Sequence, residues 1–269
     1  MSSVIFRISA GFLVAALILL ALSLYLSGYY LEEQQRLAAA EDMEDAMDQV
    51  RVAQRLDPFS PEPLQAESGI LQRQGQDRAA IDALRRATAR DPNNYLPYAL
   101  MGTIQMNRLN DYDAATGSFR KAQERNPNAT FVSTALAQSL LRQEKFDAAR
   151  RVYEKLRKED QISIESLYNL GRIYVREGQP ERGRKILREA KELAKVNLAS
   201  VDRSQKSRRE ELVESIDLSI ADSLVVEGQY DQARQIVEDS KSDQAPAILA
   251  LLENDPELYR QSVKNGEIY

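Results

Sequence analysis

The chain has 269 residues, of which 43% are hydrophobic and 29% are charged, and this composition is typical of a folded protein of substantial size. It contains no cysteine and no histidine, which excludes disulfide bonds, thiolate metal sites and catalysis by either side chain. Its formal net charge of −5 argues against a nucleic-acid partner.

The first feature along the chain is an apolar segment, residues 8–31, without any charged side chain. As a helix it would measure about 36 Å, enough for a hydrocarbon core of about 30 Å. Tyr25, Tyr29 and Tyr30 lie at its end, where an aromatic belt would sit. We therefore expect a short tail, residues 1–7, and then an uncleaved transmembrane signal anchor.

A cleaved signal peptide is the alternative interpretation of this segment. It would require a shorter apolar core, followed by a small-residue cleavage site, and the residues around Gly28 and Tyr29 form a poor one. The orientation rests on the positive-inside rule, which weighs Arg7 against Arg36. We favour a cytoplasmic N-terminus, which places the rest of the chain on the extracytoplasmic side.

Residues 32–40 are strong helix formers, and no helix breaker separates them from the apolar segment. The sequence therefore predicts one helix that continues from the membrane into the first repeat, as a stiff stalk. We also expect that deleting residues 1–31 leaves a soluble and highly helical protein.

A pattern of small residues, a large apolar residue and a proline then recurs at intervals of 34 or 35 residues. A period in this range indicates stacked helical hairpins. The pattern is clearest in residues 61–94, with Gly75, Ala80, Leu84, Ala87 and Pro92. The following units match it with Gly102, Ala115, Phe119, Ala122 and Pro127, then Ala137, Ala149, Tyr153 and Leu156, then Gly171, Gly178, Gly183, Leu187 and Ala190.

Each offset has a physical reason. The small residues let the two helices of a hairpin approach closely, and overfilling such a contact costs roughly 1–3 kcal/mol. Glycine in the turn ends the first helix without a Cβ penalty, and proline stops the second helix. Outside the four clearest units, Ala46, Val50, Ala53 and Pro58 fit the pattern before them, and Ala221, Gly228, Tyr230, Ala233 and Val237 fit it after them.

This pattern resembles the tetratricopeptide repeat family over roughly residues 30–240, although Gln34 stands where the family has a small residue and Gly183 stands at its alanine position. The resemblance implies an all-α fold, a right-handed α-solenoid of stacked hairpins after one transmembrane helix. The expected units are residues 32–60, 61–94, 95–129, 130–163, 164–213 and 214–240, followed by capping helices in 241–269. The fifth unit contains an insert, around residues 195–211, whose mixed charges suit a solvated extension of a helix.

No phosphate-binding loop or catalytic constellation stands out, so we expect no enzyme, no cofactor and no metal. The resemblance implies instead a groove lined by the first helix of each hairpin. Such a polar and partly basic groove would favour an extended peptide with acidic groups, or an anionic glycan, although the same residues could be ordinary exposed polar side chains. The predicted groove residues are Gln65, Gln72, Thr103, Asn107, Gln138, Arg142, Tyr168, Arg172 and Arg176.

The sequence thus favours a scaffold in the bacterial inner membrane that binds a protein partner and helps to assemble an envelope complex. Residues 10–130 also loosely resemble the last membrane helix and repeat tail of O-antigen ligase-like membrane proteins. That resemblance implies an alternative, an accessory subunit of a membrane glycan polymerase or ligase, and a protein export machinery is another. Self-association into a homo-oligomer is compatible with either function.

Overall fold

A computed structural model describes residues 2–196 and 202–266, with side chains from Ala10 onward except that of residue 203. These residues form helices and turns and contain no strand. The chain divides into two compact units, Met1–Ser139 and Leu140–Tyr269, and α7 contains the division between them. The first unit comprises α1 (Ser2–Ala39), α2 (Met43–Leu56), α3 (Glu62–Arg73), α4 (Asp77–Arg90), α5 (Tyr95–Asn107), α6 (Tyr112–Arg125) and most of α7 (Thr130–Arg142). The second comprises α8 (Phe146–Lys158), α9 (Ile164–Arg176), α10 (Pro180–Val196), α11 (Arg203–Val226), α12 (Tyr230–Glu238), α13 (Ala245–Asn254) and α14 (Pro256–Asn265).

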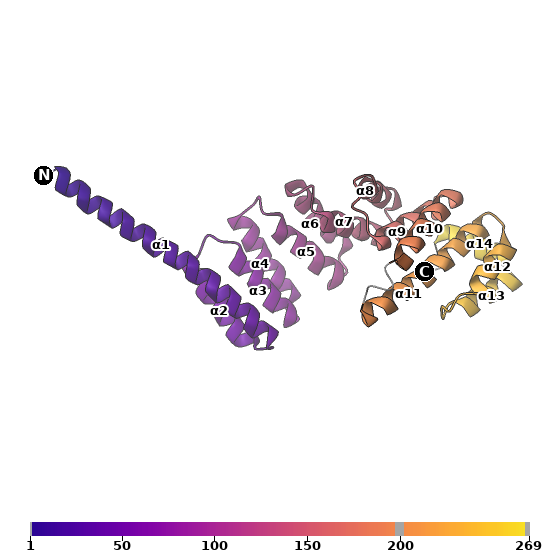
Figure 1. Cartoon of the computed structure of the whole chain (residues 1–269), viewed down its shortest axis with the longest axis horizontal. Coiled ribbons are helices and arrows are strands. Elements are labelled where there is room, and N and C mark those ends of the chain that lie inside the picture. Colours follow the sequence, from indigo (N-terminus) through magenta and orange to yellow (C-terminus); the bar gives the residue numbers. More distant parts are fainter. Residues whose placement is uncertain (1, 197–201, 267–269) are drawn as a thin grey trace. The chain divides into compact units, whose positions relative to one another are not determined.

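The prediction of one continuous helix from the apolar segment into the first repeat is confirmed by α1 (Figure 1). Residues 10–22 of α1 are exposed throughout, whereas Ser27, Gln34 and Ala38 are buried on one face. That face packs against α2, so α1 is also the first helix of the first hairpin. We call the first helix of each hairpin its A helix; these are α1, α3, α5, α7, α9 and α11.

The close approach expected inside each hairpin is visible at Gly102 of α5. A Cβ atom on this glycine would lie 2.7 Å from Cε1 of Phe119 in α6, and Phe119 itself is fully buried. Neighbouring hairpins are joined by apolar side chains, because Leu84 of α4 packs with Ile104 of α5 in one buried cluster. At Gly102 and Phe119, the small residue and the large residue that the pattern predicts therefore contact each other.

The turns inside the hairpins share a backbone conformation that the pattern predicts only in part. Gly75, Gly178 and Gly228 have φ angles of 73°, 77° and 77°, which cost glycine nothing. At the equivalent turns the same left-handed region is occupied by residues that carry a side chain, namely Glu41 (63°), Asn110 (54°) and Glu144 (56°).

Gly183 departs from the family pattern, and the packing of the second unit explains why glycine is needed at this position. A Cβ atom at this position would lie 2.6 Å from the carbonyl oxygen of Gly171 and 2.6 Å from Cγ2 of Val175. Even alanine would therefore force α9 and α10 apart.

The insert and the C-terminal helices complete the second unit. Residues 197–201 of the insert lie outside the described residues, and the rest begins α11, where Asp202 accepts hydrogen bonds from the backbone N–H groups of Ser204 and Gln205. The predicted capping region forms α13 and α14. Tyr259 of α14 donates a 2.5 Å hydrogen bond to Asp222 of α11, and both residues are buried.

Candidate functional site

The predicted groove residues all lie on A helices, and in the first unit they differ in exposure. Thr103 and Asn107 of α5 are exposed, whereas Gln65 and Gln72 of α3 and Gln138 of α7 are half-buried. The difference matters because an exposed polar group is more accessible to a ligand than a half-buried one.

Thr103 and Asn107 lie one turn apart on α5, and both are exposed, whereas Met101 and Ile104 of the same helix are buried. The Thr103 hydroxyl donates to the Ala99 carbonyl oxygen at 3.0 Å, which is a bond within its own helix. Its oxygen can still accept a hydrogen bond from a partner.

The remaining predicted residues belong to the second unit, and aromatic rings support two of them. The Arg172 guanidinium lies over the ring of Tyr168, 5.4 Å from its centre, and that of Arg176 lies 4.0 Å from the ring centre of Phe146. Arg142, at the end of α7, is exposed. The structure therefore brings Tyr168 and Arg172 together as a half-buried pair on α9.

Arg176 has a contact that the sequence pattern did not indicate. Its Nη2 donates a 3.0 Å hydrogen bond to the carbonyl oxygen of Asn265, at the end of α14. A Cβ atom on Gly266 would overlap the same guanidinium. A cation is favourable at the C-terminus of a helix, so Arg176 holds α14 against α9 and is not simply a ligand-binding side chain.

The positions of these residues show one regularity across the A helices. Gln72, Asn107, Arg142 and Arg176 follow one another at steps of 34 or 35 residues, and each is four residues after another polar position of its helix. We call this series the polar column. Its members are Gln72, Asn107, Arg142 and Arg176, with Ser68, Thr103, Gln138 and Arg172 at the preceding positions.

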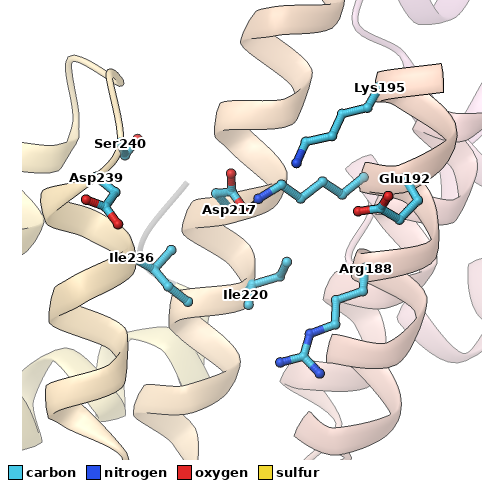
Figure 2. A pocket seen from close by; sticks show the side chains of 9 residues that line it. Arg188, Glu192, Lys195, Asp217, Ile220, Ile236, Asp239 and Ser240 are labelled. Carbon is cyan, nitrogen blue, oxygen red and sulfur yellow. Dashed lines mark hydrogen bonds and ion pairs between the residues drawn. The ribbon is translucent and has the colours of Figure 1, made fainter. Parts of the chain in front are cut away.

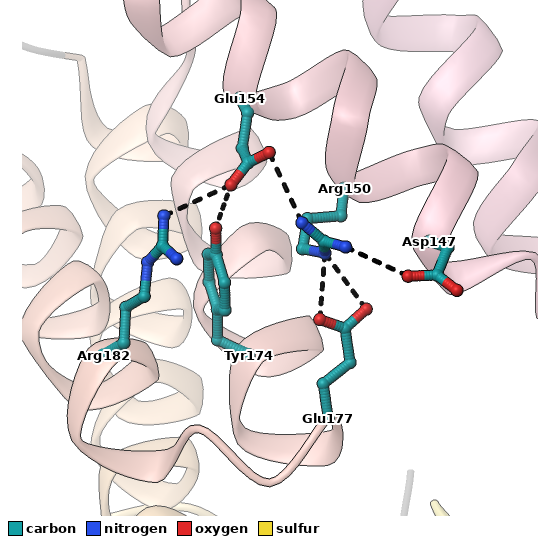
Figure 3. A network of polar contacts seen from close by, with 6 residues as sticks. All are labelled: Asp147, Arg150, Glu154, Tyr174, Glu177 and Arg182. Carbon is teal, nitrogen blue, oxygen red and sulfur yellow. Dashed lines mark hydrogen bonds and ion pairs between the residues drawn. The ribbon is translucent and has the colours of Figure 1, made fainter.

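Sequence reasoning missed a polar network that joins α8, α9 and α10 (Figure 3). Arg150 lies at its centre and contacts Glu177 at 2.9 Å and Asp147 at 3.0 Å, and these carboxylates raise its pKa. Burial and a hydrogen bond to Glu154 raise the pKa of Tyr174. Because each charged group in the network has a partner, we interpret it as a tie between helices. Figure 3 labels its members, Asp147, Arg150, Glu154, Tyr174, Glu177 and Arg182.

A second feature absent from the predictions is a hollow of about 490 Å³ between α10, α11 and α12 (Figure 2). Basic side chains of α10 line one side, and Lys191 forms an ion pair with Asp217 of α11. The basic residues of α10 that line it recur at steps of three or four residues, and this spacing in the sequence could have indicated the hollow. Opposite charges balance in the lining, so the hollow selects neither anions nor cations. The charged lining residues are Arg188, Lys191, Lys195, Glu192, Asp217 and Asp239.

Within residues 2–196 and 202–266, no three acidic side chains gather in a way that could hold an ion.

Comparisons with known proteins agree with the stacked hairpins. A model of the tetratricopeptide repeat family matches residues 134–197. A search among curated proteins found no match. Among solved structures, a fragment of MamA from Desulfovibrio magneticus RS-1 is 18% identical, with a TM-score of 0.55, over 64% of this chain and 96% of that one.

Two further structures extend the likeness. PilF of Pseudomonas aeruginosa is 16% identical over 90% of this chain and 98% of its own, with a TM-score of 0.59. YrrB, described as a tetratricopeptide repeat protein with an unusual peptide-binding site, is 18% identical over 68% of this chain and 90% of its own, with a TM-score of 0.51. At such identities the likeness concerns the fold. Residues 134–197 are thus tetratricopeptide repeat sequence, and the chain has the stacked-hairpin fold of tetratricopeptide repeat proteins.

Proposed function

We propose that the chain is a membrane-anchored scaffold that binds a protein partner through the polar column of its A helices. In this role it helps to assemble a complex of the bacterial envelope and performs no catalysis itself. The observation that carries the proposal is the exposed part of the polar column, because a packed core does not require polar side chains at the same position of successive hairpins. Thr103, Asn107 and Arg142 are exposed, whereas Ser68 is fully buried. An interaction surface that repeats with the fold suits an extended peptide.

The anchor is supported by α1, the described helix that is long and apolar enough to cross a membrane. Its residues 10–22 are exposed, among them Phe12 and Leu13 at 74% and 63%. Exposed apolar surface of this extent is unfavourable in water and favourable in lipid. We place α1 in the inner membrane with the repeats on the extracytoplasmic side.

The same helix argues for an anchor that is not cleaved. Cleavage after the apolar segment would remove Ser23 and Ser27, whose hydroxyls donate to carbonyl oxygens of α2. The first hairpin would then lose part of its own A helix. A signal peptide seldom forms part of the fold that it delivers, so these contacts favour retention.

Peptide binding is supported by the chemistry of the column. Hydroxyl and amide groups such as those of Thr103 and Asn107 can donate to and accept from a peptide backbone. Arg142 and Arg172 would favour acidic side chains in the partner. YrrB, which shares the fold, is described as having a peptide-binding site, and we extend that class of ligand to this chain as part of the proposal.

The test is affinity purification of the full-length protein from native membranes in mild detergent, followed by identification of what accompanies it. In one variant Thr103→Glu and Asn107→Glu place two charges on the exposed face of α5. In the control variant, Arg120→Ala and Lys121→Ala make the same change in net charge on the exposed face of α6.

The proposal expects a partner that accompanies the wild type and the α6 variant but is lost from the α5 variant. A partner that persists with the α5 variant, or is lost equally from both, would contradict binding through the A helices.

A further inference from the structure

One large apolar side chain of the first unit is exposed without a structural reason. Phe59 is 85% exposed, more than Phe12 of the apolar segment at 74%. It lies in the loop of residues 57–61, which joins α2 to α3. A single exposed apolar residue needs no explanation by itself, so its position in the molecule decides what it means.

Two serine hydroxyls fix the level of this loop along α1. Ser27 Oγ donates to the Ala53 carbonyl oxygen at 3.2 Å, and Ser23 Oγ donates to the Leu56 carbonyl oxygen at 2.6 Å. Near the other end of α2, Met43 packs against the same buried cluster as Leu37 of α1, so the two helices are antiparallel. The loop that follows Leu56 therefore lies beside Ser23 or closer to the N-terminus of α1.

The length of the apolar segment places that level inside or at the edge of the lipid. A hydrocarbon core of about 30 Å takes roughly 20 helical residues, so a core that begins at Ile8 would end near Ser27. The 15 or so residues from Ile8 to Leu22 cover only about 22 Å. The membrane consequently cannot end well before Ser23 without leaving apolar residues of α1 in water.

The backbone of the loop is also suited to a region of low polarity. Pro58 and Pro61 have no N–H group to leave unpaired. The Ser60 N–H donates to Asp57 at 3.1 Å, and the Ser60 carbonyl oxygen accepts a 2.8 Å bond from Arg90. Backbone groups that are already bonded cost less to move out of water.

We propose that the loop of residues 57–61 enters the edge of the membrane beside α1, with the Phe59 ring among the upper acyl chains. This inference rests on the proposed role of α1 as a membrane anchor. The loop gives the first hairpin a second point of contact with the lipid surface, at about the level of Tyr25, which is 73% exposed on α1. Two contacts at one level restrict rotation of the hairpin about the axis of α1, which a single helix would allow.

The chain contains no tryptophan, so one introduced tryptophan reports on one site. We would reconstitute full-length Phe59→Trp protein in vesicles of phosphatidylcholine and phosphatidylglycerol, with or without bromine on the upper acyl chains. Leu13→Trp reports insertion of α1, since Leu13 is 63% exposed in the apolar segment. Phe131→Trp is the matched control, a 52% exposed ring on α7.

The expected result is emission at shorter wavelength and quenching by brominated lipid for Leu13→Trp and Phe59→Trp, with neither change for Phe131→Trp. Quenching at Leu13 but not at Phe59 would overturn the loop inference and leave the anchor standing. Absence of quenching at Leu13 would overturn the anchor, and the inference with it. Equal quenching at Phe59 and Phe131 would show general adsorption of the repeats and would also overturn it.

Discussion

At the scale of single residues, the hairpins depend on contacts between a small side chain and a large one. Gly102 and Phe119 are 17 residues apart on facing helices, and the glycine leaves room for the ring. The repeat predicted this pair because both partners belong to one unit. It could not predict the contact of Arg176 with Asn265, which spans 89 residues and depends on where α14 packs.

Replacing Gly102 with leucine should destabilise the protein by at least the roughly 1–3 kcal/mol typical of overpacking. The reason is steric, since even a Cβ atom would lie 2.7 Å from a ring that is fully buried. Urea denaturation followed by circular dichroism measures the change. Gly117→Ala on α6 is the control, because no atom lies within 4 Å of its added Cβ and it should stabilise the helix by about 0.5–1 kcal/mol. Equal midpoints for the leucine variant and the wild type would contradict the assigned contact.

At the scale of elements, α1 joins a candidate membrane span to a packed helix of the first hairpin, and the two overlap. The apolar segment predicted an anchor as far as residue 31, with the repeats beginning after it. The structure shows that α1 already packs on α2 from Ser23 onward. A hydropathy pattern cannot reveal this overlap, because lipid and a protein core select the same apolar side chains.

The overlap changes what truncation should do. Deleting residues 1–22 should leave a soluble, folded fragment, because all of the removed side chains that the structure describes are exposed. Deleting residues 1–31 also removes Ser23 and Ser27, whose hydroxyls donate to the carbonyl oxygens of Leu56 and Ala53 in α2. We therefore expect the longer deletion to lower the melting temperature or to cause aggregation. Thermal melts and size-exclusion chromatography compare the two, and identical behaviour would show that residues 23–31 serve the membrane alone.

At the scale of the whole molecule, the period of 34 or 35 residues was sufficient to predict stacked hairpins, because each unit must bury its apolar face on its neighbours. The polar column follows from the same register. The identity of the partner could not be predicted, since the fold does not determine which side chains occupy exposed positions such as Thr103 and Asn107. The hollow beside Lys191 was missed for a related reason, because it arises where the insert breaks the period.

The same architecture predicts that a destabilising substitution affects mainly its own hairpin and the neighbouring hairpins. In stacked repeats, stability is approximately a sum of hairpin and nearest-neighbour terms, so different regions open with different free energies. Gly102→Leu should therefore speed amide hydrogen exchange in α5 and α6 and leave α11 and α14 unchanged. Tyr259→Phe should speed exchange in α11 and α14 and leave α5 and α6 unchanged, since it removes the hydroxyl that donates to the buried Asp222. Hydrogen–deuterium exchange read by mass spectrometry resolves these segments. Uniformly faster exchange along the chain in either variant would mean that the hairpins unfold as one cooperative body, and the additive description of this protein would have to be abandoned.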